Sequence, residues 1–184
     1  MAERVCPVWV GYLLASPIRK LFQDPDKILG PYIKENMTVL DIGCAMGFFS
    51  VPAAQMVGRN GKVICVDLQE EMFKPLEKRA LKAGVIDRIE TRICDEKSLK
   101  LDDMAEKIDF AFALAVAHEV PDVPVFFSEI YKTLKPEHKF LVAEPKGHIS
   151  KKDFEKSISI ARENGFKIVE RPKARFNRVV VLKK

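Results

Sequence analysis

The residues best suited to chemistry lie in the stretch 37–50, where an acid and two glycines follow a short apolar run. Asp41 is the last residue of a short run that favours β-strand, and Gly43 and Gly47 come shortly after it. This pattern is typical of a buried parallel strand that turns sharply into a helix. Glycine permits positive φ and a close ligand approach, and the first N–H groups of a helix lack intrahelical partners. The stretch therefore predicts a ligand-binding strand–loop–helix.

Two further acids follow the next two expected strands. Asp67 comes directly after residues 62–66, and Asp95 comes shortly after residues 88–93. The carboxyl ends of parallel strands share one edge of a sheet, where such sheets bind ligands. Asp67 also lies twenty residues beyond Gly47, where a doubly wound fold places a carboxylate that accepts hydrogen bonds from ribose hydroxyls. The three acids together predict a nucleoside-binding edge.

The elements that must position these residues alternate between strand and helix and close with a strand pair. Strands are expected over residues 37–41, 62–66, 88–93, 108–113, 139–143, 166–170 and 176–182, and helices over 48–57, 69–83, 123–134 and 150–164. We expect Pro75 to kink its helix and residues 135–138 to form a turn. This order predicts a doubly wound α/β fold with right-handed crossovers.

The pattern Asp41-x-Gly43-x-x-x-Gly47 resembles the glycine-rich first motif of class I S-adenosylmethionine-dependent methyltransferases. Ala45 stands where that motif has its middle glycine. The resemblance spans roughly residues 37–182 and implies a Rossmann-like, seven-stranded, mostly parallel sheet with an antiparallel last strand and helices on both faces. It implies S-adenosylmethionine as cofactor, with the loop around its methionine part and Asp95 accepting from the adenine amino group. The expected cofactor-binding residues are Asp41, Gly43, Cys44, Ala45, Gly47, Asp67, Leu68, Cys94, Asp95 and Ala115.

The segment His118-Glu119-Val120-Pro121-Asp122 resembles the one that follows the fourth strand in small-molecule methyltransferases of quinone biosynthesis and arsenite methylation. His118, with Glu119, is the candidate for catalysis, because histidine can act as a general base near neutral pH. His118 could instead only pack beside the methionine moiety. Glu144, at the end of the fifth strand, is a candidate on the substrate side. The Asn/Asp-Pro-Pro-Tyr/Phe pattern of methyltransferases acting on base amines does not occur.

Residues 1–36 form an N-terminal helical extension, which we expect to act as a lid over the methyltransferase domain of residues 37–184. Within it, Asp24 and Pro25 predict a helix start. Trp9 and Tyr12 could place π-faces against the cofactor's cationic sulfonium and contact substrate, or they could pack in the core.

Composition narrows the class further. A chain of 184 residues with 47% hydrophobic content fits one globular domain. No apolar run is long enough for a membrane helix, so we expect a cytoplasmic protein without membrane insertion. The four cysteines form no C-x-x-C pair, and no metal site is expected. Cys44 and Cys94 are either reduced core thiols or ligands of a thiol or metalloid substrate.

The leading prediction is an enzyme that methylates a small-molecule acceptor by in-line displacement. Residues 151–184 hold eleven Lys and Arg against four Asp and Glu. This basic segment is either a solvated surface or the binding face for RNA, which leaves an RNA or protein methyltransferase as one alternative. A second alternative is a non-catalytic module that only binds the cofactor. A nicotinamide dehydrogenase is disfavoured, because the G-x-G-x-x-G spacing is missing.

Overall fold

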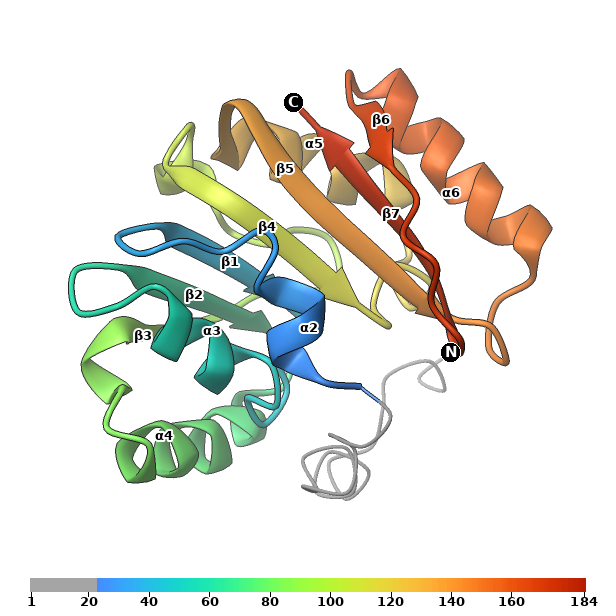
Figure 1. Ribbon diagram of the computed structural model, residues 1–184. Coiled ribbons are helices and arrows are strands. Elements are labelled where there is room, and N and C mark those ends of the chain that lie inside the picture. The colour runs from blue at the N-terminus through green and yellow to red at the C-terminus, as the bar shows by residue number, and fades with distance from the viewer. Residues whose placement is uncertain (1–22) are drawn as a thin grey trace. The chain divides into compact units, whose positions relative to one another are not determined.

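The structure is a computed structural model that describes residues 23–184 (Figure 1). The chain divides into two compact units, the first ending at Ile93 and the second beginning at Cys94.

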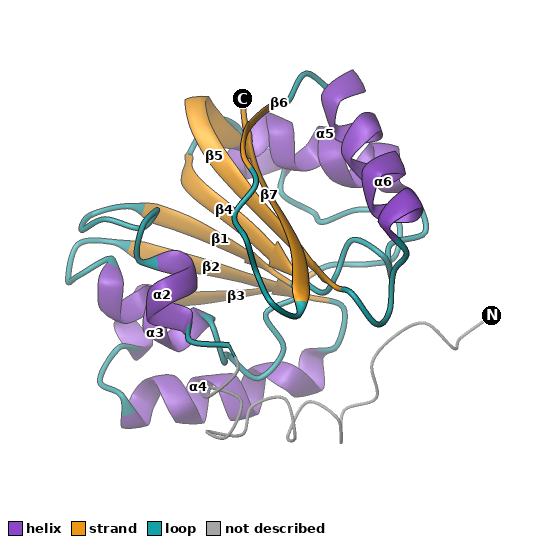
Figure 2. Ribbon diagram, turned by 45° about the vertical axis from the view of Figure 1, so that its right-hand side comes forward, coloured by secondary structure: helices purple, strands orange, loops and turns teal. Residues whose placement is uncertain are grey.

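The described part of the first unit is built on three parallel strands with three helices. The strands are β1 (Thr38–Ile42), β2 (Lys62–Asp67) and β3 (Ile89–Ile93), and the helices are α2 (Pro25–Leu29), α3 (Ser50–Met56) and α4 (Phe73–Lys82). Strand β2 pairs in parallel with β1 and with β3. Every residue of β2 after Lys62 is buried, as its unbroken apolar run requires. The three helices lie on one face of these strands (Figure 2).

The second unit has four strands and two longer helices. The strands are β4 (Ile108–Leu114), β5 (Leu134–Pro145), β6 (Lys167–Glu170) and β7 (Asn177–Lys183), and the helices are α5 (Val123–Thr133) and α6 (Lys151–Glu163). Strand β5 is parallel to β4, and β7 runs antiparallel between β5 and β6. Helices α5 and α6 lie side by side on one face of these strands (Figure 2). The Phe127, Phe140 and Phe166 rings pack against one another with centroids 5.9–6.3 Å apart.

The strands of both units belong to one sheet with the order β3-β2-β1-β4-β5-β7-β6. The sheet is parallel except for β7, which is inserted between two strands of the opposite direction. The predicted fold class, a mostly parallel seven-stranded Rossmann-like sheet with an antiparallel last strand, is therefore confirmed.

Two local predictions are wrong. Residues 135–138 form no separate turn, because β5 already begins at Leu134 and these residues bulge from its ladder with β4. Their backbone is held from the far end of the chain, since the Glu137 N–H donates to the Lys184 carbonyl at 3.2 Å and the Lys184 N–H donates to the His138 carbonyl at 3.0 Å.

The helix expected over residues 69–83 also differs from the prediction. It is a 3₁₀ turn, Glu70–Met72, followed by α4 from Phe73. Pro75 therefore lies in the first turn of α4, where a missing N–H removes no intrahelical hydrogen bond. Instead of one long helix kinked at Pro75, the chain forms a short 3₁₀ turn and then begins α4 at Phe73.

Candidate active site

The loop between β1 and α3 is folded back onto the end of β2. The Gly43 and Cys44 N–H groups both donate to the Val66 carbonyl, at 2.8 and 3.1 Å. Gly43, Ala45 and Gly47 all have positive φ, at 72°, 44° and 77°. Glycine adopts this conformation at no steric cost, whereas Ala45 adopts it against its preference. Every second residue from Gly43 to Gly47 is therefore in a conformation that favours glycine.

Asp67 is the anchor of this loop. Its Oδ2 accepts a hydrogen bond from the Ala45 N–H at 2.8 Å, and its Oδ1 accepts one from the Gln69 N–H at 3.0 Å. Burial raises the pKa of Asp67, and the donated N–H groups oppose that shift. Asp67 ends β2, and its carboxylate holds two backbone segments at once, a role that the sequence did not predict. Contact between Asp67 and ribose hydroxyls stays a prediction.

Asp41 lies beneath the loop rather than on its surface. Its side chain is 3% exposed, and its Oδ2 accepts a hydrogen bond from the Ser50 Oγ at 2.6 Å. Burial raises the pKa of Asp41 to about 7, the Ser50 hydrogen bond lowers it, and the negative charge of Asp67 raises it. Asp41 therefore ties the end of β1 to the start of α3, and direct contact between Asp41 and the cofactor stays a prediction.

Exposed aliphatic side chains lie near Asp67. Leu68 is 38% exposed directly after Asp67, and Ile93, the register partner of Asp67 on β3, is 44% exposed. Two exposed aliphatic side chains thus lie near a carboxylate, one next to it in the chain and one beside it on β3. Cofactor contact by Leu68 stays a prediction, and Ile93 was not among the predicted site residues.

Close packing against α4 leaves no room for a side chain at Gly47. A Cβ at Gly47 would lie 2.8 Å from the Leu76 Cγ of α4, closer than Cβ contacts in proteins allow. Together with its φ of 77°, this makes Gly47 a requirement of the fold as well as of the expected ligand.

In the second unit, the Asp95 side chain caps the tight loop that follows it. Its Oδ1 accepts hydrogen bonds from the Lys97 and Ser98 N–H groups, both at 2.9 Å, and its Oδ2 pairs with the Lys100 Nζ at 3.2 Å. The Lys97 N–H and then Lys100 lower the pKa of this exposed carboxyl. Recognition of the adenine amino group by Asp95 stays a prediction, as does cofactor contact by the buried Cys94 beside it.

His118 and Glu144 form a short, partly buried polar contact in the second unit. His118 Nδ1 lies 2.5 Å from Glu144 Oε2, and the Glu144 side chain is 1% exposed. The hydrogen bond to Glu144 raises the pKa of His118, although partial burial of the ring opposes this. Glu119, predicted to assist His118, lies farther away, with its Oε1 3.9 Å from the His118 Nε2. Catalysis by His118 and Glu119 and substrate contact by Glu144 stay predictions.

Two backbone hydrogen bonds hold the segment that leads from β4 to His118. Ala115 has φ of 64°, and its N–H donates to the Ala143 carbonyl at 2.8 Å, which ties the end of β4 to β5. The Glu119 N–H then donates to the Val116 carbonyl at 2.9 Å and closes the turn that carries His118. Ala115 was predicted to bind cofactor, which stays a prediction; its observed contact is the backbone hydrogen bond to Ala143.

The sulfur atoms of the loop region are buried thiols. Burial, first of all, raises the pKa of Cys44, and a hydrogen bond with Cys65 raises it further. A thiol that keeps its proton is a weak nucleophile and a weak metal ligand. Within residues 23–184, no three His, Cys, Asp or Glu side chains are placed to hold a metal ion. These features favour core thiols over a metalloid-binding role for Cys44.

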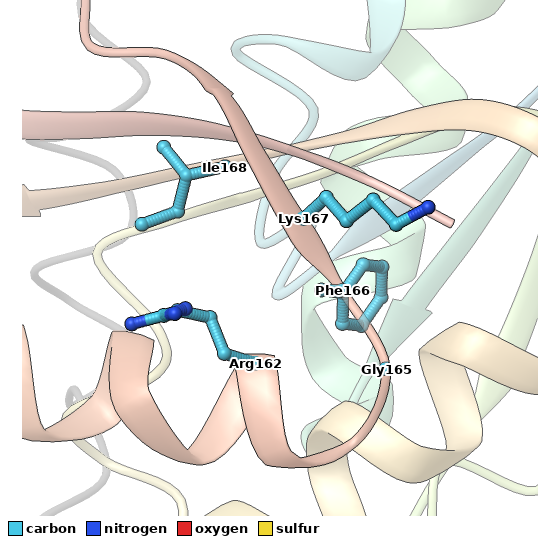
Figure 3. Close-up of a pocket in the computed structure, with 5 residues that line it drawn as sticks. All are labelled: Arg162, Gly165, Phe166, Lys167 and Ile168. Atoms are coloured by element: carbon cyan, nitrogen blue, oxygen red, sulfur yellow. The ribbon is translucent and has the colours of Figure 1, made fainter.

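Several charges of the basic C-terminal segment are paired. Arg171 forms a bidentate pair with Glu155, at 2.9 and 2.8 Å, and Lys183 pairs with Glu137. A surface recess lies beside the end of α6, lined by Arg162, Gly165, Phe166, Lys167 and Ile168 (Figure 3). The Arg162 and Lys167 side chains point in opposite directions in this view, so their charges do not converge on one anion.

Only residues 23–36 of the predicted lid lie within the described part of the chain. Trp9 and Tyr12 lie outside the described residues. The Asp24 side chain caps α2 as predicted, by accepting from the Asp26 N–H, and α2 buries Leu29 completely. This part of the extension belongs to the packed body of the first unit. Over the part of the chain that is described, no helix combines the length and apolar character needed to cross a membrane.

A glycine loop anchored on the acid that ends β2, in a sheet with this strand order, defines a class I S-adenosylmethionine-dependent methyltransferase. A sequence profile described as "Methyltransferase domain" matches residues 33–176, and the chain belongs to that methyltransferase domain family. The donor of this class is S-adenosylmethionine.

Individual proteins agree with this assignment. A SAM-dependent methyltransferase from Aquifex aeolicus has 25% identity and a TM-score of 0.85, over 97% of this chain and 99% of that one. A SAM-dependent O-methyltransferase from Thermotoga maritima, with 21% identity and a TM-score of 0.69 over 88% of this chain and 64% of that one, shares the fold.

One curated relative is the ubiquinone/menaquinone biosynthesis C-methyltransferase UbiE of Escherichia coli. It is 28% identical over 113 residues, which is 61% of this chain. The match spans only 44% of the length of UbiE.

Proposed function

We propose that the protein transfers the methyl group of S-adenosylmethionine to a small-molecule acceptor. The observation that carries the proposal is the Asp67 carboxylate, which holds the glycine loop by the Ala45 N–H and stands beside the exposed Leu68. A partly buried acid next to an apolar surface suits a ribose with its attached base.

The protein's contribution to such a transfer is mostly alignment. When bound, the donor supplies a methyl group on a positively charged sulfur, which leaves as a neutral thioether. Asp67 would accept hydrogen bonds from the ribose hydroxyls, and the loop from Gly43 to Gly47 would lie against the methionine part. A fixed geometry and a pocket poor in water are what an in-line displacement needs most.

The nature of the acceptor is inferred from two features. The UbiE relative is named as a C-methyltransferase of quinone biosynthesis, which supports a small organic acceptor. The ion pairs of Arg171 and Lys183 reduce the free positive charge of the C-terminal segment. RNA binding depends on unpaired basic groups that neutralise phosphates, so this pairing favours a small acceptor over RNA.

Isothermal titration calorimetry with S-adenosylhomocysteine tests the cofactor part of the proposal. We expect binding in the micromolar range, and no heat at millimolar ligand would overturn the assignment. Incubation with methyl-labelled donor and three fractions of a cell extract tests the acceptor part. Label should enter the small-molecule fraction, whereas label only in RNA or protein, or in nothing, would reject a small-molecule acceptor.

A further inference from the structure

The buried carboxylate of Glu144 is only half satisfied. Its Oε2 contacts His118 at 2.5 Å, but its Oε1 is buried and has no hydrogen-bond partner among residues 23–184. Buried polar atoms nearly always have partners, so an orphan oxygen on a side chain that is 1% exposed calls for an explanation. A purely structural carboxylate at this position would be a costly choice.

A basic residue lies opposite Glu144 in the sheet. Arg178 is its direct partner in the antiparallel register between β5 and β7, which places both side chains on one face of the sheet. The Arg178 Nη1 is itself buried without a hydrogen-bond partner among the described residues. A guanidinium cation on the same face offsets part of the cost of burying an anion.

The short contact between Glu144 Oε2 and His118 Nδ1 fixes the tautomer of the ring. A carboxylate can only accept, so the neutral imidazole carries its proton on Nδ1 and leaves the Nε2 lone pair free to accept a proton. The His118 side chain is 20% exposed, so the ring is held by a buried partner yet reachable from outside. Oriented histidines that serve as general bases have this arrangement.

The other charged or titratable groups near the ring do not replace Glu144. The Glu119 Oε1 lies 3.9 Å from Nε2, beyond hydrogen-bond distance, and His148 meets the His118 ring edge-on with centroids 6.0 Å apart. The turn that begins at Pro145 holds His148, whose N–H donates to the Pro145 carbonyl at 3.1 Å. Among the described residues, no three His, Cys, Asp or Glu side chains are placed here to hold a metal ion.

We propose that His118 is the general base of methyl transfer, that Glu144 is its positioning residue, and that the acceptor carries an ionisable hydroxyl or thiol at, or conjugated to, the methylated atom. This inference rests on the proposed function. In the step, His118 Nε2 takes the proton. The electron pair freed from the O–H or S–H bond forms the new bond to the methyl carbon, directly or through a conjugated ring carbon. In the second case the methylated ring carbon then loses its own proton and the oxygen regains one, which restores the aromatic ring. The pair of the broken carbon–sulfur bond stays on sulfur, and the imidazolium later releases its proton to solvent.

The first test needs no acceptor. The chain has three histidines, so an NMR titration can follow His118 individually after assignment with His138→Gln and His148→Asn. Glu144→Gln keeps the shape and removes the charge, and we expect it to lower the pKa of His118. Glu144→Asp should restore part of the shift, and Glu119→Gln should change it less. An unchanged His118 titration in Glu144→Gln overturns the positioning role. S-adenosylhomocysteine should also perturb the His118 signal, and a signal insensitive to a bound ligand contradicts a catalytic place.

The second test uses methyl transfer to the small-molecule fraction of an extract. We expect His118→Gln to lower kcat by about 10²- to 10⁴-fold, with affinity for S-adenosylhomocysteine unchanged within about threefold. Glu144→Gln should lower kcat less and move the acidic limb of the pH profile to lower pH. His138→Gln, on an exposed bulge, serves as control. If the wild type binds ligand but transfers nothing, the proposed function fails; if it transfers and His118→Gln is as fast, only this inference fails.

Discussion

The Ala45 N–H donates to the Asp67 Oδ2 at 2.8 Å, so the middle of the glycine loop is suspended from the acid that ends β2. Residues 22 positions apart thus share one hydrogen bond that shapes the loop. The same carboxylate also accepts from the Gln69 N–H, so the loop after β1 and the loop after β2 are tied to one side chain.

Replacing this acid should separate ligand binding from folding. In Asp67→Asn, the amide can accept from only one of the two N–H groups, which leaves the other without its acceptor at a cost of about 1–3 kcal/mol. We expect the affinity for S-adenosylhomocysteine to fall by about tenfold or more, measured by calorimetry. Asp87→Asn, at an exposed acid of the same unit, is the matched control. Equal affinities of the two variants would remove Asp67 from the site.

Ala45 tests how much strain the loop tolerates. An alanine at φ 44° is held in a left-handed conformation that costs about 1–2 kcal/mol relative to glycine. Ala45→Gly keeps the N–H that donates to Asp67. Glycine also makes the unfolded chain more flexible, which offsets the gain in stability by up to about 1 kcal/mol. We expect urea unfolding to show a gain of up to about 1 kcal/mol and calorimetry to show unweakened ligand binding. A clear loss of stability would mean that the Ala45 methyl contributes packing that outweighs the strain.

Gly47 combines two constraints that substitution can separate. Gly47→Ala meets both a φ of 77° and a contact of 2.8 Å with the Leu76 Cγ, whereas Gly84→Ala meets a φ of 67° with no atom within 4 Å. We expect Gly84→Ala to lose about 1 kcal/mol and Gly47→Ala about 2–4 kcal/mol of unfolding free energy. Equal losses in chemical denaturation would show that the Leu76 side chain moves aside and that only the backbone matters.

The features that were predictable from sequence are local ones. The strand, glycine loop and helix start around Asp41 are encoded within about ten neighbouring residues, and the acid after β2 follows from the strand pattern. The His118–Glu144 pair joins residues 26 positions apart through the register of β4 and β5. That register is not readable from either segment alone, so both residues were candidates but their pairing was not. The failed turn at residues 135–138 has the same origin, because its backbone partner is Lys184.

Asp41 predicts a pH dependence of stability with a definite sign. Burial raises its pKa to about 7 in the folded protein, from 3.8 for an ordinary aspartate. Between these values the folded state keeps a proton that the unfolded state has released, so this group makes stability fall as pH rises from about 4 to about 7, after which its effect is constant.

The variant Asp41→Asn cannot titrate but can still accept the Ser50 hydroxyl hydrogen bond. Wild type should therefore lose about 3 kcal/mol more than Asp41→Asn between pH 5 and pH 8, since each pH unit is worth about 1.4 kcal/mol. Urea unfolding of both proteins at the two pH values measures this difference, and the comparison cancels the titration of all other groups. Parallel losses in the two proteins would show that Asp41 is ionised in the fold. The buried acid would then be held as an anion, and the Ser50 hydroxyl would stabilise a charge instead of a proton-bearing carboxyl.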